Sequence, residues 1–233
     1  GELKTKPTQH SVKALQTAGL QPDFIICRSE MELTDTVRDK ISLFSNVKND
    51  HVISNPDLQS IYELPLILER QNMGDLLGKH LDLKTRLVEE NVFGRWVNHV
   101  KKFTTSYETT VKIAMPGKYV DNKDSYVSIN EALKHACAQH EVNLEIVFVD
   151  TEKEDFTGDL LACDGILLTP GFGTRGVEGM IRSAEIAFER KIPYLGICFG
   201  SQLMYVAFMR RQLGLKDAHS TEIDMDCSAP VVD

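Results

Sequence analysis

The chain has 233 residues, 42% of them hydrophobic, and 34 acidic against 26 basic side chains give a formal net charge of −8 at pH 7. This length and composition fit one large or two modest globular domains with a real core. The acidic balance argues against non-specific binding to nucleic acid or to anionic membranes. No apolar stretch reaches the roughly 18 residues of a membrane span, and no signal-peptide pattern opens the chain.

The cysteines indicate the redox environment. Five are spread along the chain without a Cys-x-x-Cys pair: Cys27, Cys137, Cys163, Cys198 and Cys227. An odd, dispersed set predicts neither a disulfide framework nor a zinc site, and no metal ligands are predicted in this chain. We therefore expect a protein of the reducing cytoplasm.

A short basic segment, Lys4-Thr5-Lys6-Pro7-Thr8-Gln9, opens the chain. Alternate side chains of an extended segment face one side, so Lys4 and Lys6 could present two ammonium groups together. Gln9 could read an amide or carbonyl edge. A solvated basic loop is the alternative interpretation.

Strands and helices alternate through the first hundred residues. We predict a helix capped by Ser11 over 12–18 and ended by Gly19, a strand at 23–27, a helix carrying Val37 and Ile41, and a strand at 52–54. Two apolar helical patches follow, Leu66-Ile67-Leu68 and Leu76-Leu77, and Gly74 and Gly78 are expected to interrupt the helices. An amphipathic helix is then predicted over 88–102, with Val92, Trp96, Val97 and Val100 at helical spacing.

A polar stretch near 103–109 is the predicted linker, so that 1–105 and 106–233 form separate domains. Beyond it, strands are predicted at 111–115, 144–149, 165–169 and 194–197, and helices at 125–139 and 177–189. This alternation predicts a parallel sheet with helices on both faces, whose reactive groups gather at the carboxyl ends of the strands.

The segment from Lys191 to Gln202 joins a short apolar strand to an apolar helix, with Cys198 at the turn. Gly196 and Gly200 remove Cβ atoms where the backbone must turn sharply or approach closely. The helix N-terminus beside Cys198 favours a thiolate by roughly 0.3–1 kcal/mol, and the Phe199 and Gly200 amides could face an oxyanion. The pattern indicates a nucleophile, and a buried structural cysteine is the alternative.

A glycine-rich turn follows the predicted strand before this one. Gly171, Gly173, Gly176 and Gly179 fall within nine residues, which is more than a simple strand-exit turn needs. Its backbone could supply a second oxyanion donor.

These motifs resemble those of the CTP synthase family. Residues 193–202, Pro-Tyr-Leu-Gly-Ile-Cys-Phe-Gly-Ser-Gln, and the glycine-rich stretch 170–180 are similar to its class I glutamine amidotransferase domain, and residues 1–12 are similar to part of its synthetase domain. The resemblance extends over essentially all 233 residues. It implies an α/β fold: the end of a parallel-sheet nucleotide-binding synthetase domain, then the first part of a flavodoxin-like class I glutamine amidotransferase domain, incomplete at both ends.

The resemblance also implies roles for individual residues. Cys198 is the catalytic nucleophile. The implied glutamine-binding residues are Gly171, Phe199, Gly200, Ser201, Gln202 and Glu222, where the Glu222 carboxylate holds the amino group. The implied UTP- and CTP-binding residues are Lys4, Thr5, Lys6, Pro7, Thr8, Gln9 and Lys40. Those implied to line the adenine pocket of ATP are Pro56, Asp57 and Leu58.

Two departures from the family pattern qualify this picture. Pro170 stands where the family has a glycine, and proline has no N–H, so the oxyanion donor must come from Gly171. The P-loop and Mg²⁺ ligands of the family are expected upstream of this chain, and the histidine and glutamate of the cysteine triad downstream. His219 aligns with a non-catalytic position, so we do not expect it to activate Cys198.

The family's activity is ATP-dependent amination of UTP to CTP in pyrimidine biosynthesis, with ammonia released from glutamine through a Cys198 thioester. The implied cofactors are ATP with Mg²⁺ and GTP as allosteric activator, and a homo-oligomer from dimer to tetramer or filament is expected. Another class I amidotransferase or related cysteine hydrolase would keep the cysteine turn but lack the Lys4–Gln9 segment. A non-catalytic assembly module is the other alternative.

Overall fold

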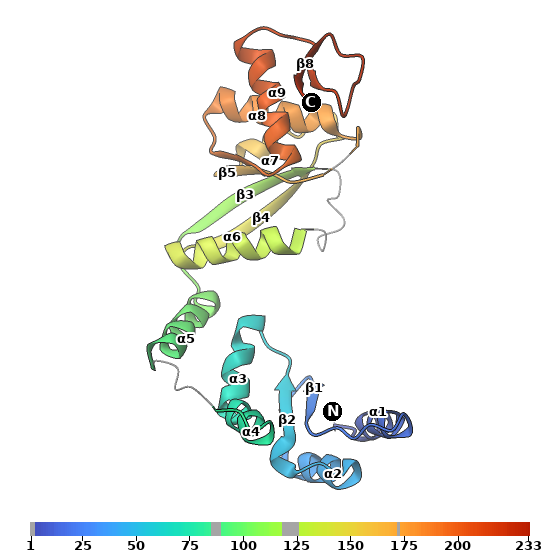
Figure 1. Ribbon diagram of the computed structural model, residues 1–233. Helices are drawn as coiled ribbons and strands as arrows, with labels where there is room; N and C mark the ends of the chain where they lie inside the picture. The colour runs from blue at the N-terminus through green and yellow to red at the C-terminus, as the bar shows by residue number, and fades with distance from the viewer. Residues whose placement is uncertain (1–2, 85–89, 118–125, 172) are drawn as a thin grey trace. The chain divides into compact units, whose positions relative to one another are not determined.

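The computed structural model describes residues 3–84, 90–117, 126–171 and 173–233. It divides into two compact units, Gly1–Thr105 and Ser106–Asp233. Each unit has helices and parallel strands of its own (Figure 1). The first residues of two predicted helices, 88–89 and 125, lie outside the described residues.

The first unit is built around two parallel strands. Its helices are α1 (Lys6–Thr17), α2 (Asp35–Ser45), α3 (Leu64–Arg70), α4 (Met73–His80) and α5 (Glu90–Thr104), its strands are β1 (Ile25–Ser29) and β2 (Val52–Pro56), and Asn49–His51 and Ile61–Glu63 form 3-10 turns. The strands pair in register from Ile25↔Val52 to Ser29↔Pro56. The β-α alternation predicted for this region is confirmed.

A small core joins α1 and α2 to the strands. It consists of Val12, Ile25, Cys27, Ile41, Val47 and Val52, with Leu33 and Val37 packed against it. The helix predicted to carry Val37 and Ile41 is confirmed as α2, and the Thr34 side chain caps it by accepting a hydrogen bond from the Val37 N–H at 3.4 Å.

The extended conformation predicted for Lys4–Gln9 is wrong from Lys6 onward, because α1 already begins there. Pro7 lies in the first turn, where its fixed φ suits a helix and its missing N–H costs nothing. Ser11 is therefore inside the helix, and its hydroxyl donates to the Pro7 carbonyl at 3.1 Å instead of capping. Gly19 follows the helix end with a φ of 83°, as predicted.

The glycines predicted to interrupt the next helices do not do so. Gly74 and Gly78 both lie inside α4, while the break between α3 and α4 falls at Asn72, which adopts a left-handed φ of 54°. In α5, Val100 is buried and the indole N–H of Trp96 donates to the Tyr62 carbonyl at 3.1 Å. Trp96 therefore ties α5 to the turn before α3.

The second unit contains a four-stranded parallel sheet with the order β4-β3-β5-β6. Its strands are β3 (Thr110–Gly117), β4 (Asn143–Asp150), β5 (Gly165–Leu168) and β6 (Tyr194–Gly196), and its helices are α6 (Val127–His140), α7 (Thr157–Leu161), α8 (Val177–Arg190) and α9 (Phe199–Gln212). A separate pair, β7 (Ala218–Ser220) and β8 (Ala229–Val232), was not predicted from the sequence.

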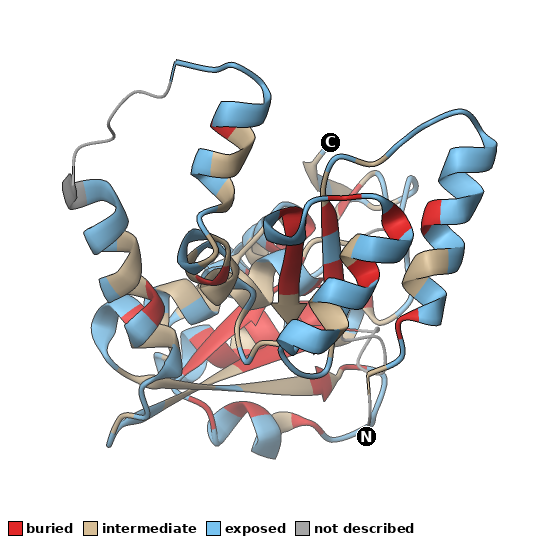
Figure 2. Cartoon of the chain, turned by 90° about the horizontal axis from the view of Figure 1, so that it is seen from below, coloured by how far each residue is buried: buried red, intermediate tan, exposed pale blue. Residues whose placement is uncertain are grey.

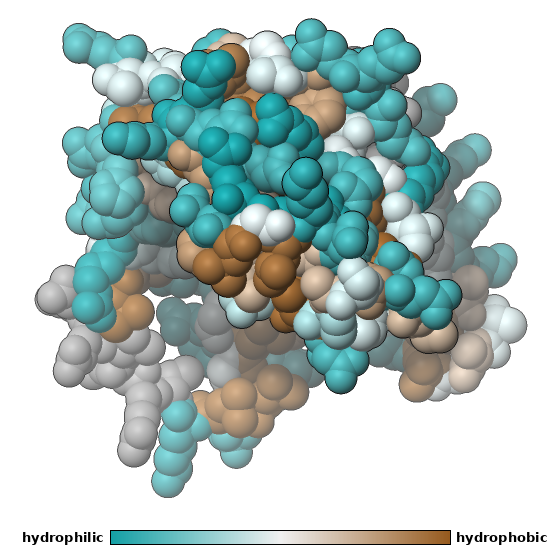
Figure 3. Space-filling view, turned by 90° about the horizontal axis from the view of Figure 1, so that it is seen from above, coloured by the Kyte–Doolittle hydropathy of each residue, from teal (hydrophilic) through white to brown (hydrophobic). Residues whose placement is uncertain are grey.

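Helices cover both faces of this sheet, as predicted (Figure 1). Met115 and Leu167 point to the face where Leu133 of α6 packs, whereas Ala114 and Ile166 point to the face covered by α7 and α8. Buried residues concentrate in β5, in the second half of β3 and on one side of α8, and Figure 2 colours buried residues red along the chain. The outer surface in Figure 3 is largely polar with smaller apolar areas.

Helix α8 approaches the end of β4 very closely. A Cβ added to Gly179 would lie 2.2 Å from the Thr151 carbonyl oxygen, and the Thr151 hydroxyl donates to the Gly176 carbonyl at 3.2 Å. Glycine is therefore required at position 179. By contrast, an added Cβ on Gly158 of α7 would meet no atom within 4 Å.

We expect Gly179→Ala to lower the free energy of unfolding by about 1–3 kcal/mol, because the backbone of Thr151 cannot move aside cheaply. Gly158→Ala is the matched control, and it should leave stability unchanged or raise it by up to about 1 kcal/mol. Urea unfolding of both variants measures the difference. Equal stability of the two would contradict this account of the contact.

Candidate active site

Cys198 lies at the turn between β6 and α9, at an unusual backbone geometry. Its φ of 51° and ψ of −110° belong to a region that non-glycine residues avoid. The two flanking glycines make the turn possible: a Cβ on Gly196 would lie 2.5 Å from the Gly200 carbonyl carbon, and one on Gly200 would lie 2.3 Å from the Leu168 carbonyl oxygen. The close approach predicted for both glycines is confirmed.

The turn at Cys198 and the glycine-rich segment follow neighbouring strands. Leu168 at the end of β5 pairs with Gly196 at the end of β6, and the Ile197 N–H donates to the Leu168 carbonyl at 3.0 Å. Gly171 and Cys198 thus both lie beyond the carboxyl edge of the sheet, which confirms their predicted location. Phe172, in the same motif, lies outside the described residues.

Two backbone N–H groups, one next to Cys198 in the sequence and one after the neighbouring strand β5, make no hydrogen bond with the described residues. The N–H groups of Phe199 and Gly171 donate to no described residue, and a Cβ on Gly171 would lie 3.8 Å from the Phe199 ring. The Gly200 amide, expected to face the oxyanion, instead donates to the Ile197 carbonyl at 2.9 Å. This bond closes the first turn of α9, so the role of Gly200 here is close packing.

Ser201 and Gln202 continue the first turn of α9. The Ser201 hydroxyl donates to the Cys198 carbonyl at 2.6 Å, and the Gln202 N–H donates to the same oxygen at 3.2 Å. The side-chain Oε1 of Gln202 is buried and accepts no hydrogen bond from any described residue. A buried acceptor without a donor is uncommon in native proteins, and a bound ligand could supply the donor.

Glu222 lies in the turn after β7 and is exposed. Its N–H donates to the Ser220 hydroxyl at 3.2 Å, and its carboxylate forms no ion pair within the described ranges. The neighbouring Ile223 packs against the buried cluster that contains Phe199 and Leu203. The segment that carries Glu222 is thus anchored to the same core as the cysteine turn.

His219 is engaged away from Cys198. Its Nε2 lies 3.3 Å from a Glu178 carboxylate oxygen, and its Nδ1 accepts from the Ser220 N–H at 3.0 Å. Since both ring nitrogens have these partners, the structure offers no His219 base to Cys198.

Cys198 differs from the other cysteines in its exposure. Cys27 and Cys163 are buried, Cys137 and Cys227 are partly buried, and Cys198 is exposed. Burial raises the pKa of the Cys27, Cys163 and Cys137 thiols, which makes them poorer nucleophiles at neutral pH. These observations disfavour the structural-cysteine alternative for Cys198.

Three lysines of the first unit line an open cavity of about 720 Å³. Its lining residues are Leu3, Lys4, Thr5, Lys6, Pro7, His10, Thr36, Val37 and Lys40. Lys4, Lys6 and Lys40 thus meet at one cavity, although α1 and α2 bring them together and not an extended segment. Sequence reasoning missed His10, which follows Lys6 by one helical turn and would have been found had the early helix start been recognised.

Thr8 and Gln9, predicted for the same site, do not line this cavity. The side-chain amide of Gln9 donates to the Thr5 hydroxyl at 3.1 Å, so it braces the first turn of α1. That Gln9 reads the edge of a bound ligand stays a prediction.

Pro56, Asp57 and Leu58 lie at the carboxyl end of β2. The Asp57 N–H donates to the Ser29 carbonyl at 2.8 Å, and its carboxylate pairs with the Arg28 guanidinium at 3.4 Å. Both side chains are exposed, which limits the strength of this ion pair. Arg28 was not singled out from the sequence.

No group of three or more His, Cys, Asp or Glu side chains suited to a metal ion occurs among the described residues. Over the same residues, no helix has the length and apolar character to cross a membrane.

We expect a limiting amount of iodoacetamide to alkylate Cys198 before Cys27 and Cys163 in the folded chain, because an exposed thiol is accessible and a buried one is not. Peptide mass spectrometry after short labelling times gives the order. Labelling in denaturant is the control, since it should remove the difference. Cys163 reacting as fast as Cys198 in the folded chain would contradict the assignment.

Comparison with known proteins identifies the family of this site. Residues 1–83 match the family model described as "CTP synthase N-terminus", and residues 121–231 match "Glutamine amidotransferase class-I". The CTP synthase of Pyrococcus furiosus is 50% identical over 235 residues, and that of Caldanaerobacter subterraneus is 48% identical over 236. Each alignment covers 100% of this chain and 43% of the relative.

A solved structure titled "Trypanosoma brucei CTPS - glutaminase domain with bound acivicin" is 35% identical, with a TM-score of 0.49, over 52% of this chain and 48% of that chain. The chain spans less than half the length of the curated relatives it matches. The two family models occur in order, and the identity extends along the whole chain. The chain therefore belongs to the CTP synthase family.

Proposed function

We propose that this chain is the part of a CTP synthase that joins the late synthetase domain, residues 1–105, to the first part of the glutaminase domain, residues 106–233. The complete enzyme would aminate UTP to CTP at the expense of ATP, with ammonia from glutamine. The observation that carries the proposal is an exposed Cys198 at a strained strand-to-helix turn, together with N–H groups of Gly171 and Phe199 that donate to no described residue.

In the glutaminase half, the Cys198 thiolate attacks the side-chain amide carbon of glutamine. The two N–H groups stabilise the negative charge on the amide oxygen. The C–N bond then breaks while the nitrogen takes up one proton, so that it leaves as ammonia. Water then hydrolyses the thioester and releases glutamate. The base for these proton transfers is the family's triad histidine, which the resemblance places outside this chain.

Two side chains of the second unit would recognise glutamine. The unpaired Oε1 of Gln202 would accept an N–H from the bound molecule, which removes the cost of a buried acceptor. The Glu222 carboxylate, without an ion pair among the described residues, would face the ammonium group. Ser201 and Gly200 support the site through the backbone of the turn.

In the synthetase half, the cavity lined by Lys4, Lys6 and Lys40 would take the triphosphate of UTP, or of CTP as product. Three ammonium groups around one cavity suit a polyanion of this kind. Pro56, Asp57 and Leu58 would line the adenine pocket of ATP. ATP phosphorylates O4 of UTP, and ammonia then displaces that phosphate at C4 to give CTP.

The proposal also includes properties that the family resemblance implies but that we assign to no residue of this chain. These are Mg²⁺ bound with ATP, activation by GTP, assembly into a homo-oligomer from dimer to tetramer or filament, and a cytoplasmic location.

We expect Cys198→Ala in the complete enzyme to abolish CTP formation from glutamine and to leave CTP formation from added ammonia largely intact. The reason is that Cys198 acts only in releasing ammonia. Assays with each nitrogen source measure the two activities, with Cys227→Ala as control. Equal loss with both sources would mean that Cys198 is structural.

We expect Lys6→Ala in the complete enzyme to raise the apparent constant for UTP by roughly ten- to a hundred-fold, the value of one charge-assisted contact. Inhibition by CTP should weaken in parallel. UTP titration at saturating ammonia isolates this step from glutamine hydrolysis. The control is Lys13→Ala, an exposed lysine of α1 that does not line the cavity. Unchanged UTP curves for both Lys4→Ala and Lys6→Ala would remove the nucleotide assignment.

A further inference from the structure

The segment that carries Glu222 has little regular structure of its own. β7 has three residues and pairs only with β8 among the described strands, with an irregular register between His219 and Ser220. Glu222 follows in a turn. A carboxylate on such a short element needs support from outside it to keep a fixed position.

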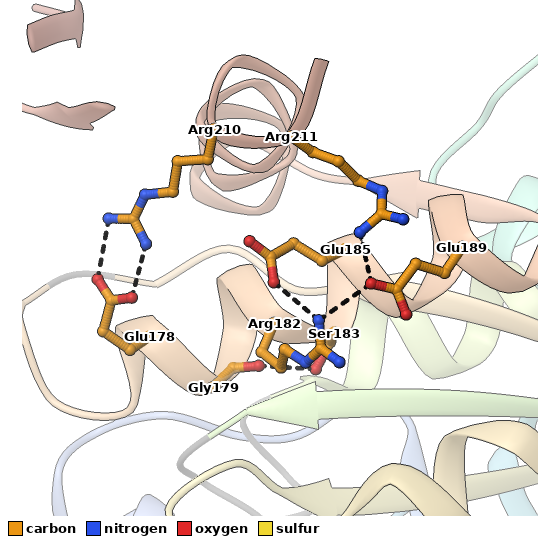
Figure 4. A network of polar contacts seen from close by, with 8 residues as sticks. All are labelled: Glu178, Gly179, Arg182, Ser183, Glu185, Glu189, Arg210 and Arg211. Carbon is orange, nitrogen blue, oxygen red and sulfur yellow. Dashed lines mark hydrogen bonds and ion pairs between the residues drawn. The ribbon is translucent and has the colours of Figure 1, made fainter. Parts of the chain in front are cut away.

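Arg210 of α9 gives that support through three hydrogen bonds. Its Nε donates to the Ala218 carbonyl at 2.9 Å. Its Nη1 and Nη2 donate to the two carboxylate oxygens of Glu178 at 2.7 and 3.1 Å (Figure 4). The Arg210 side chain is only 17% exposed. One guanidinium therefore joins α8, α9 and β7.

The contacts continue from Glu178 toward Glu222. The His219 ring lies 3.3 Å from a Glu178 carboxylate oxygen, and its Nδ1 accepts from the Ser220 N–H. The buried Ser220 hydroxyl in turn accepts from the Glu222 N–H at 3.2 Å. The hydrogen bond from Arg210 lowers the pKa of Glu178 against the opposing effect of burial, with the charges of Arg210 and His219 adding to the lowering. Glu178 is thus an anion at neutral pH.

We propose that Arg210 is a positioning residue of the glutamine site: together with Glu178 and His219 it holds β7 so that the Glu222 carboxylate meets the amino group of glutamine. This inference rests on the proposed function, which assigns Glu222 to that group. Arg210 itself touches no substrate in this account. It acts through the backbone of Ala218 and the side chain of Glu178.

Lysine could not replace Arg210 in this role. The planar guanidinium donates to the Ala218 carbonyl and to both Glu178 oxygens at fixed angles, whereas an ammonium group on a flexible stem cannot reach all three. Arg210→Lys therefore keeps the positive charge but loses the simultaneous hydrogen bonds to Ala218 and Glu178.

The neighbouring Arg211 is a matched control. It lies on the same helix, is 40% exposed, and pairs with Glu189, which also receives a hydrogen bond from Arg182 (Figure 4). None of its hydrogen bonds or ion pairs within the described residues reaches β7. Arg211→Lys thus makes the same chemical change without touching the segment that carries Glu222.

The test compares Arg210→Lys and Arg211→Lys in the complete enzyme. For Arg210→Lys we expect the glutamine KM to rise about five- to twenty-fold. This is less than the loss of a whole charge-assisted contact, because Glu222 is displaced and not removed. Its kcat for glutamine hydrolysis and its rate of CTP formation from ammonia should change by less than about two-fold, because the Cys198 turn is untouched. Arg211→Lys should leave all three parameters near the unaltered enzyme.

Two further measurements separate positioning from general stability. Amides of residues 218–224 should exchange hydrogen faster in Arg210→Lys, while amides of β3 and β5 should not. In a Glu222→Gln background, Arg210→Lys should raise the glutamine KM by less than about two-fold, because both changes act on one contact.

An unchanged glutamine KM in an active Arg210→Lys enzyme overturns the proposal. It is also overturned if Arg210→Lys raises the glutamine KM by the same factor with and without Glu222→Gln. Faster exchange throughout the second unit also overturns it, since it would show a loss of stability and not of position. An unaltered complete enzyme that hydrolyses no glutamine overturns the proposed function, and the glutamine role of Arg210 with it. Local exchange at 218–224 then still shows whether Arg210 holds β7.

Discussion

The close approach of α9 to the end of β5 organises the second unit. The α-carbon of Gly200 stands so near the Leu168 carbonyl that no side chain fits between them. This contact fixes where α9 begins, and Cys198, as the residue before the helix, is therefore turned out to solvent. Phe199 is turned inward by the same geometry and joins the core formed by α8 and α9.

Local sequence patterns were enough to predict this part of the molecule. Apolar runs and glycines placed the parallel strands, the helices on both faces, and the close contacts of Gly196 and Gly200. These features depend on residues within one strand-turn-helix unit, so their signals lie close together in the sequence. The exposure of Cys198 follows from the same unit.

Features fixed by longer-range contacts were not predictable in this way. The strands β7 and β8 are too short to show the apolar-polar alternation that identifies a strand. Arg210 and Glu178 hold this pair from helices that precede it in the chain. At the N-terminus, Pro7 was interpreted as part of an extended segment although it lies in the first turn of α1. That error hid His10 and the convergence of α1 and α2 on one basic cavity. The buried Gln202 Oε1 without a hydrogen-bond donor could not be predicted either, because burial depends on the tertiary structure.

The left-handed backbone of Cys198 also bears on how selection acts at this position. A non-glycine residue at such a φ costs of order 1–3 kcal/mol, and glycine would relieve that strain. Selection for stability alone would therefore replace the cysteine. The cysteine found here therefore presents an exposed thiol at some expense in the stability of the fold, which is a trade between activity and stability.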